Sequence, residues 1–184
     1  MRILIFVPLL LFAGCAKKEG DQTTAIQEAV FRYQFAHNAS VGQGSPQVWF
    51  LAFGDPHEKR AMDPPEAFMT RFSDLRPRIG QYSEAGRSES GWVIDKKTKE
   101  GGVIFFVHDI CLMGPDSASA KGGYQQDKLS ASGNTYQLKF GWRGWRVTSA
   151  TLDWISQRKT NRQAEPASVA RIISARHWTQ AETK

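Results

Sequence analysis

The pair His108-Asp109 is the first place in this chain where the residue types could move a proton. Both residues interrupt the apolar run VIFFVHDICLM, where an ionisable group is costly unless a partner stabilises it. Adjacent side chains of a strand point to opposite faces of a sheet, so we expect that the two do not share one pocket. They are expected to be a satisfied or exposed polar pair, and they remain the candidate acid or base of an enzymatic alternative.

The histidines and glycines of the chain do not have the pattern of a metal or cofactor site. His37, His57, His108 and His177 are scattered, and none has the spacing of zinc ligands. No serine has the context of a nucleophile elbow, and the Gly122-Gly123 pair lacks the strand-to-helix setting of a phosphate loop. We therefore expect neither a metal nor a cofactor.

Cys15 follows a leader with the parts of a secretory signal. Met1-Arg2 is a short positive segment, and an unbroken apolar run covers residues 3–12. At about 1.5 Å per residue, that run is too short to cross a hydrocarbon core of about 30 Å. If Cys15 is modified, Cys111 is left without a disulfide partner, and its apolar surroundings predict a buried, inert thiol.

The stretch LFAGC at residues 11–15 resembles the lipobox of bacterial lipoproteins. The resemblance implies that residues 1–14 are removed as a signal peptide and that Cys15 carries the lipid. Phe12 departs from the pattern, because a lipobox usually has leucine three residues before the cysteine. The residue after the cysteine is Ala16 rather than an aspartate, and in this the chain resembles lipoproteins sorted to the outer membrane. The expected location is the cell envelope, on the periplasmic side of an outer membrane if the cell has one; ordinary secretion is the alternative.

The composition predicts one folded domain. The chain has 184 residues, of which 41% are hydrophobic and 23% charged, as is typical of globular proteins. The net charge of +6 is spread over short runs without a nucleic-acid motif, so no nucleic-acid partner is expected. We expect a lipid-anchored tether at 15–22, a single α+β domain at 23–156, and a basic tail at 157–184 with a short helix from about Pro166.

Residues 24–38 have the pattern of a long amphipathic helix. Thr24 and Gln27 have the spacing of a capping box. Apolar residues follow at helical spacing: Ile26, Ala29, Val30 and Tyr33, with Phe31 and Phe35 widening the arc. A face of this width predicts packing on a sheet, with Ile26, Val30 and Tyr33 against the face that carries Leu138 or Val147.

The rest of the chain predicts short strands around one more helix. A strand or buried turn is expected at 47–53, a short helix from Pro64-Pro65 to Pro77, and a connection at 78–90. Hairpins are expected from 92–94 with 102–113 and within 129–155, with a weaker strand at 117–124 between them. In the last hairpin, residues 141–144 can supply the turn, and a change of phase in the second arm predicts a bulge near 148–150.

This order of elements, ending in YQLKFGWRGWRV, resembles the nuclear transport factor 2-like (cystatin-like) α+β fold. More narrowly, EAVFRYQFAHN with the GGY and SASGNTY stretches resembles uncharacterised bacterial lipoproteins. The resemblance covers about residues 24–156. It implies a long helix packed on a curved antiparallel sheet, with a cup between them. Members of the superfamily range from isomerases to binding modules, so the fold does not decide the function.

We therefore predict a non-enzymatic, lipid-anchored envelope domain that binds a small apolar ligand or an envelope protein in the cup. The side chains expected to line the cup are Tyr33, Trp49, Tyr136 and Trp145. The alternative is a small isomerase or hydratase-like enzyme, in which His108 or Asp109 transfers the proton and Tyr33 or Tyr136 donates a hydrogen bond.

Overall fold

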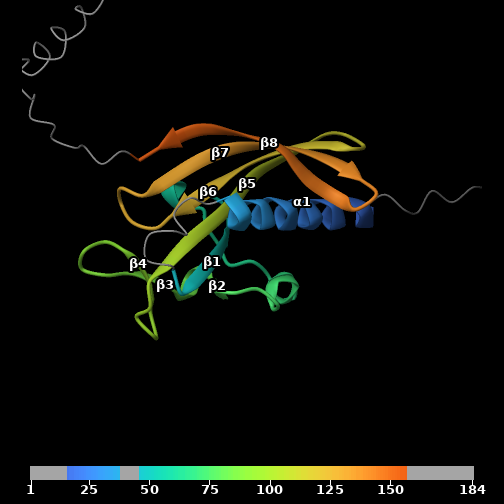
Figure 1. Cartoon of the computed structure of the whole chain (residues 1–184). Coiled ribbons are helices and arrows are strands. Elements are labelled where there is room, and N and C mark those ends of the chain that lie inside the picture. Colours follow the sequence, from blue (N-terminus) through green and yellow to red (C-terminus); the bar gives the residue numbers. More distant parts are fainter. Residues whose placement is uncertain (1–15, 38–45, 157–184) are drawn as a thin grey trace, which may run out of the picture.

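The computed structural model describes residues 16–37 and 46–156, which form a long helix, a six-stranded sheet and a small second sheet (Figure 1). The long helix is α1 (Ala16–His37). The large sheet contains β1 (Val48–Phe53), β2 (Arg78–Gln81), β5 (Gly102–Gly114), β6 (Ser117–Gln125), β7 (Ala131–Gly141) and β8 (Gly144–Ile155). The small sheet pairs β3 (Ala85–Arg87) with β4 (Val93–Asp95). The helical turns are η2 (Pro56–Glu58), α2 (Glu66–Met69) with η3 (Thr70–Phe72), and η4 (Tyr82–Glu84).

The fold is α+β, with α1 on a mixed and largely antiparallel sheet. The strand order is β2-β1-β5-β6-β7-β8. Strands β5 to β8 form an antiparallel meander, whereas β1 is parallel to both β2 and β5. The sequence prediction of a wholly antiparallel sheet is therefore wrong at the edge formed by β2 and β1. The cause is the helical connection between β1 and β2, which returns the chain to the same end of the sheet, as a parallel pair requires.

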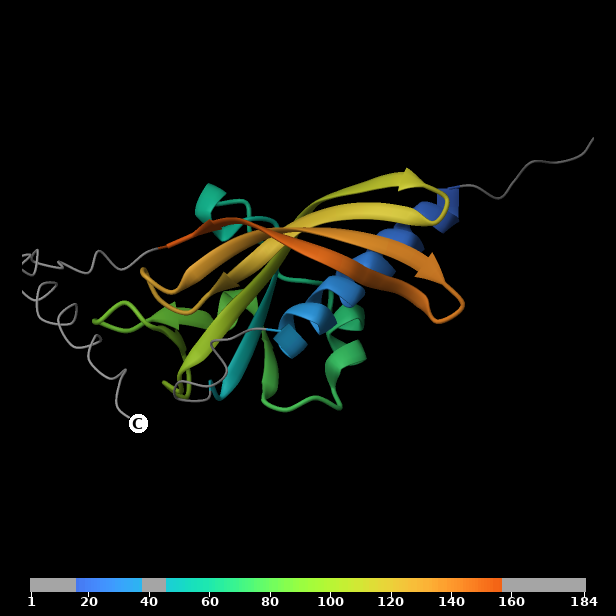
Figure 2. The same ribbon diagram turned by 45° about the horizontal axis from the view of Figure 1, so that its top comes forward.

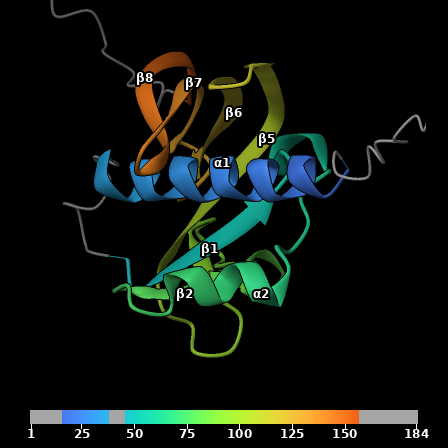
Figure 3. The same cartoon turned by 90° about the vertical axis from the view of Figure 1, so that its right-hand side faces the viewer.

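Helix α1 packs on the sheet through the face that the sequence predicts. Ile26, Val30 and Phe31 are fully buried. They share one core cluster with Leu138, and Tyr33 and Val147 pack against its edge. Figure 3 shows α1 running between β5–β8 on one side and β1, β2 and α2 on the other.

The start of α1 differs from the sequence prediction. The helix begins at Ala16, so the predicted capping box at Thr24 lies inside it. The Thr24 hydroxyl donates instead to the Gly20 carbonyl oxygen at 2.9 Å, a bond typical of threonine within a helix. Residues 16–22, expected to be a tether, are helical. Alanine, lysine and glutamate are good helix formers and extend the helix in this polar segment.

The predicted hairpin between 92–94 and 102–113 is also wrong. A single bridge joins Ile94 to Gly101, and β4 pairs with β3 instead. The segment 78–90, expected to be a connection, contains β2, η4 and β3. The buried Asp95 carboxylate holds this region together. It accepts hydrogen bonds from the N–H groups of Thr98 (2.9 Å) and Lys97 (2.7 Å) and pairs with Arg78, and these contacts lower the pKa of Asp95.

The last hairpin matches its prediction. Gly141 and Gly144 flank the turn, with Gly144 at a φ of +92°, a conformation that glycine adopts without strain. The register changes from Gln137 opposite Ser149 to Leu138 opposite Val147. Thr148 is therefore the extra residue of a bulge, within the predicted 148–150.

Cys111 is exposed, not buried as its apolar surroundings predict. Strand β1 pairs with β5 only as far as Val107. The second half of β5 therefore extends beyond the core with β6 as its one partner strand, and residues 111–113 are exposed. An apolar sequence run does not distinguish this strand end from a buried one.

Val30→Ala should lower the free energy of unfolding by roughly 1 to 3 kcal/mol, through loss of two buried carbons and the cavity that remains. Lys97→Ala is the control. Its side chain is exposed, and its replacement should change stability by no more than about 0.5 kcal/mol. Urea melts compare the two variants. Equal stabilities would contradict the packing of α1 on the sheet.

Candidate functional site

A cavity of about 240 Å³ lies between the last turns of α1 and the sheet. We call it the helix–sheet cavity. Its lining comprises Tyr33, Gln34 and His37 of α1, with Phe105, Gly123, Tyr124, Ser132, Asn134, Tyr136 and Ala150 of the sheet. Two of the four residues expected in the cup, Tyr33 and Tyr136, therefore line it. Trp49 and Trp145 do not; both belong to the core, where Trp49 stacks on Phe35 with ring centroids 4.6 Å apart.

Gln34 is the residue that fixes the geometry of this cavity. The side chain is only 5% exposed, and its Nε2 donates to the carbonyl oxygens of Phe106 (3.2 Å) and Gly123 (3.3 Å). Because carbonyls can only accept, the amide nitrogen must face the sheet. The other amide atom, Oε1, has no hydrogen-bond partner among the described residues.

Gly122 makes the approach of Gln34 to the sheet possible. A Cβ atom at position 122 would lie 2.3 Å from the Phe106 carbonyl oxygen and 3.0 Å from Gln34 Nε2. Any larger residue would therefore push the glutamine away from the strand. Sequence analysis missed Gln34. Its one signal in the sequence is a polar residue four positions after Val30, within the apolar arc of the predicted helix.

Two tyrosines give the cavity an aromatic wall and a polar group. The Tyr33 ring meets the Tyr136 ring edge-on at 5.8 Å and stacks on His37 at 4.0 Å. The Tyr136 hydroxyl accepts from Gln34 Nε2 at 3.2 Å. Burial raises the pKa of Tyr136 above its usual value, so the hydroxyl stays protonated and can donate. Among the described residues that line the cavity, none is Asp, Glu, Lys or Arg.

His108 and Asp109 line a different cavity, of about 350 Å³, on the opposite face of the sheet. His108 continues the alternation of Ile104 and Phe106, which belong to a second core cluster, whereas Phe105 belongs to the cluster under α1. The pair therefore does not reach the helix–sheet cavity. We call its site the acidic cavity, because its lining includes Asp55, Glu58, Asp109 and Asp153.

The expectation that His108 and Asp109 cannot share a pocket is wrong. The register with β6 shifts between His108 and Cys111, and Asp109 has a φ of +47°. Such a bulge breaks the alternation of side chains. His108 Nδ1 lies 3.3 Å from Asp109 Oδ2, and His108 Nε2 lies 3.9 Å from Asp55 Oδ2.

The electrostatics of the acidic cavity keep Asp109 ionised. Desolvation opposes ionisation, but His108 and Lys121, whose Nζ is 3.6 Å away, outweigh it and lower the pKa of Asp109. A general base near neutral pH needs the opposite shift. Within residues 16–37 and 46–156, no group of three or more His, Cys, Asp or Glu residues is placed to hold a metal ion.

No protein-family model, curated protein or solved structure matches this chain. The resemblance to the nuclear transport factor 2-like fold and to bacterial lipoproteins therefore stays a prediction. Cys15, the predicted lipidation site, and the tail at 157–184 lie outside the described residues. No helix in the described part of the chain is long and apolar enough to cross a membrane.

Tyr136→Phe should change how stability depends on alkaline pH. A raised pKa in the folded state means that the protonated hydroxyl contributes stability below the unfolded pKa of about 10, and that this contribution is lost as the pH rises through the folded value. Near neutral pH, the free energy of unfolding of the wild type should exceed that of the variant by roughly 0.5 to 1.5 kcal/mol. The difference should shrink or reverse above about pH 10. Urea melts across this range measure it; a constant difference would contradict the burial of this hydroxyl.

Proposed function

We propose that this chain is a lipid-anchored envelope protein that binds a small, neutral, partly apolar ligand in the helix–sheet cavity. The observation that carries the proposal is Gln34, a residue of the cavity lining whose buried Oε1 has no hydrogen-bond partner among the described residues. A buried polar atom without a partner costs free energy. A ligand that donates a hydrogen bond to this oxygen would remove that cost.

The lining indicates the class of ligand. Tyr33 and Phe105 offer aromatic surface, while Ser132, Asn134 and the Tyr136 hydroxyl offer hydrogen bonds. The described lining contains no Asp, Glu, Lys or Arg, so an ionised ligand would lose its hydration without gaining a permanently charged partner. A molecule with an apolar ring and one hydroxyl or amide group fits this combination. We take the cavity to be the cup that the fold resemblance implies.

The geometry favours binding over proton transfer in this cavity. Tyr136 stays protonated, because burial raises its pKa. His37 is stacked on Tyr33, and its Nδ1 lies 2.9 Å from the Tyr33 carbonyl oxygen, an arrangement that occupies one ring nitrogen. The enzymatic alternative relied on His108 or Asp109, which lie on the other face of the sheet. We therefore keep the non-enzymatic interpretation.

Ala150→Phe should block ligand binding, because Ala150 is an exposed residue at the cavity wall and a phenyl ring there would occupy the space. The probe is benzyl alcohol, with binding to the wild type followed by NMR chemical-shift changes. The variant should bind at least tenfold more weakly, which is about 1.4 kcal/mol.

Ser149→Phe is the matched control for this test. Ser149 is also exposed and precedes Ala150 in β8, but it pairs with Gln137 and therefore faces the other side of the sheet. This variant should bind benzyl alcohol like the wild type, and benzoate, the ionised counterpart, should bind more weakly than the alcohol. Equal binding by both variants, or preference for benzoate, would overturn the assignment of the cavity.

Cys15→Ser should abolish acylation, and the protein should leave the membrane fraction or keep its leader. The motivation is the LFAGC stretch at residues 11–15, and two or three acyl chains are enough for stable anchoring. Mass spectrometry of the wild-type N-terminus should show an acylated Cys15 as the first residue. An unmodified terminus at any other residue would refute the anchor.

A further inference from the structure

Two hairpin turns form an apolar end of the molecule that no other described element covers. The end of β5 carries Leu112 and Met113, the end of β7 carries Phe140, and the β7–β8 turn carries Trp142. Met113 is 66%, Phe140 53% and Trp142 89% exposed. The turns are joined, because the Phe140 N–H donates to the Asp116 carbonyl oxygen at 2.8 Å. We call residues 112–116 and 139–146 the hairpin end.

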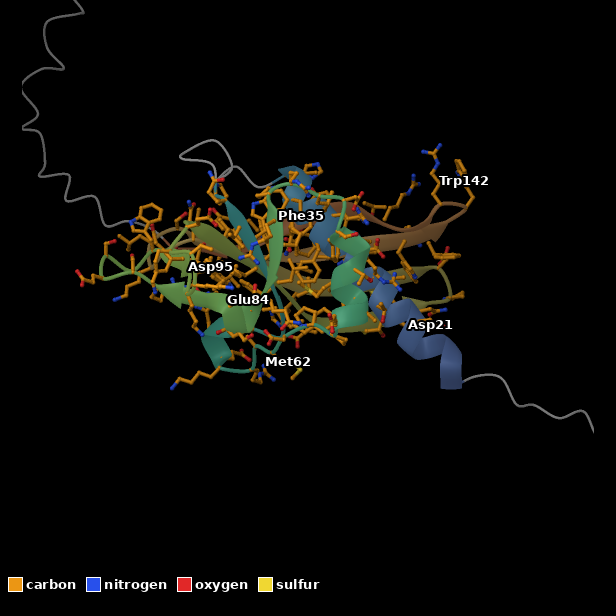
Figure 4. The ribbon with its side chains drawn as sticks, turned by 90° about the horizontal axis from the view of Figure 1, so that it is seen from below. Asp21, Phe35, Met62, Glu84, Asp95 and Trp142 are labelled. Carbon is orange, nitrogen blue, oxygen red and sulfur yellow. The ribbon has the colours of Figure 1, made fainter. Side chains whose placement is uncertain are left out.

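The hairpin end lies at the same end of the molecule as the start of α1. Both turns extend as far as the first turn of α1 in two views (Figures 1 and 2). Figure 4 shows Trp142 and Asp21 at this end, with Asp95 toward the other. Helix α1 begins at Ala16, one residue after the proposed lipid on Cys15. The anchor therefore brings this end of the molecule to the bilayer.

The charges of the hairpin end are those expected of a surface that meets phospholipid. Lys139, Arg143 and Arg146 stand against a single carboxylate, Asp116, which pairs with Lys139 at 3.7 Å. The Arg143 guanidinium lies over the Trp142 ring, 4.2 Å from its centroid. Tryptophan is favoured at membrane interfaces, and arginine beside it can reach lipid phosphates.

We propose that the hairpin end docks on the bilayer that holds the lipid of Cys15. Trp142 and Met113 enter the interfacial layer, and Arg143 and Arg146 bind the phosphates of anionic lipids. Docking fixes the orientation of the domain, since the lipid and the two turns together contact the surface at several points. The inference rests on the lipid anchor proposed above, and it does not depend on a ligand in the helix–sheet cavity.

The test uses the full chain, produced with its own leader, extracted from membranes and reconstituted into vesicles of phosphatidylethanolamine and phosphatidylglycerol. Bromine on the acyl chains quenches the emission of tryptophans that enter the bilayer. Brominated vesicles should quench part of the wild-type emission, and Trp142→Phe should lose most of this quenching. Trp92→Phe is the matched control, because Trp92 is also exposed. It directly precedes β4, which lies at the other end of the molecule (Figure 1). Its replacement should leave the quenching in place.

Mass spectrometry of the same sample separates the two proposals. Acylated Cys15 with quenching that depends on Trp142 supports docking. Acylated Cys15 without such quenching overturns docking and leaves the anchor intact. In that case, a cross-linker placed at position 142 that captures another protein would assign the hairpin end to that partner. Unmodified Cys15 overturns both the anchor and the docking that rests on it.

Discussion

The contact between the Gln34 amide and the backbone of β5 and β6 sets the position of α1 along the sheet. Apolar packing of Ile26 and Val30 holds the helix against the strands, but such packing is not directional. The bonds from Nε2 to the carbonyls of Phe106 and Gly123 are directional, and they require the glycine at position 122. The helix–sheet cavity exists where this polar contact interrupts the apolar core.

The sheet separates two cavities of different chemistry. The helix–sheet cavity combines aromatic rings with uncharged polar groups, while the acidic cavity gathers carboxylates around His108 and Lys121. If the hairpin end meets the membrane, the helix–sheet cavity lies toward the far end of α1, because Tyr33, Gln34 and His37 belong to its last turns.

Sequence periodicity located the features that depend on many residues acting together. The buried face of α1 and the bulge at Thr148 follow from apolar residues repeated over several positions. Strands of three or four residues, such as β2, β3 and β4, offer too few positions for a period, and the sequence did not reveal their pairing. Exposure of Cys111 depends on where β1 ends, which no local pattern encodes.

The residues of the two cavities also divide into those that the sequence predicted and those that it did not. Four residues were expected in the cup that the fold resemblance implies. Tyr33 and Tyr136 line the helix–sheet cavity, whereas Trp49 and Trp145 belong to the core. The contact between His108 and Asp109 was not predicted, because it depends on the positive φ of a single residue, Asp109. Aspartate adopts that conformation more often than most residues do, but its presence in a sequence does not predict it. Gln34 was missed because its role depends on glycines distant in the sequence.

The side-chain amide of Gln34 offers the most direct test of how α1 is fixed to the sheet. Solution NMR can follow the exchange of its two Nε2 protons with solvent and their nuclear Overhauser effects to the strands. We expect slow exchange, with contacts to Gly122, Gly123 and the Tyr136 ring. Exchange at the rate of a free glutamine amide, without contacts to β6, would show that α1 is not fixed to the sheet in this way and that the helix–sheet cavity does not have the proposed polar wall.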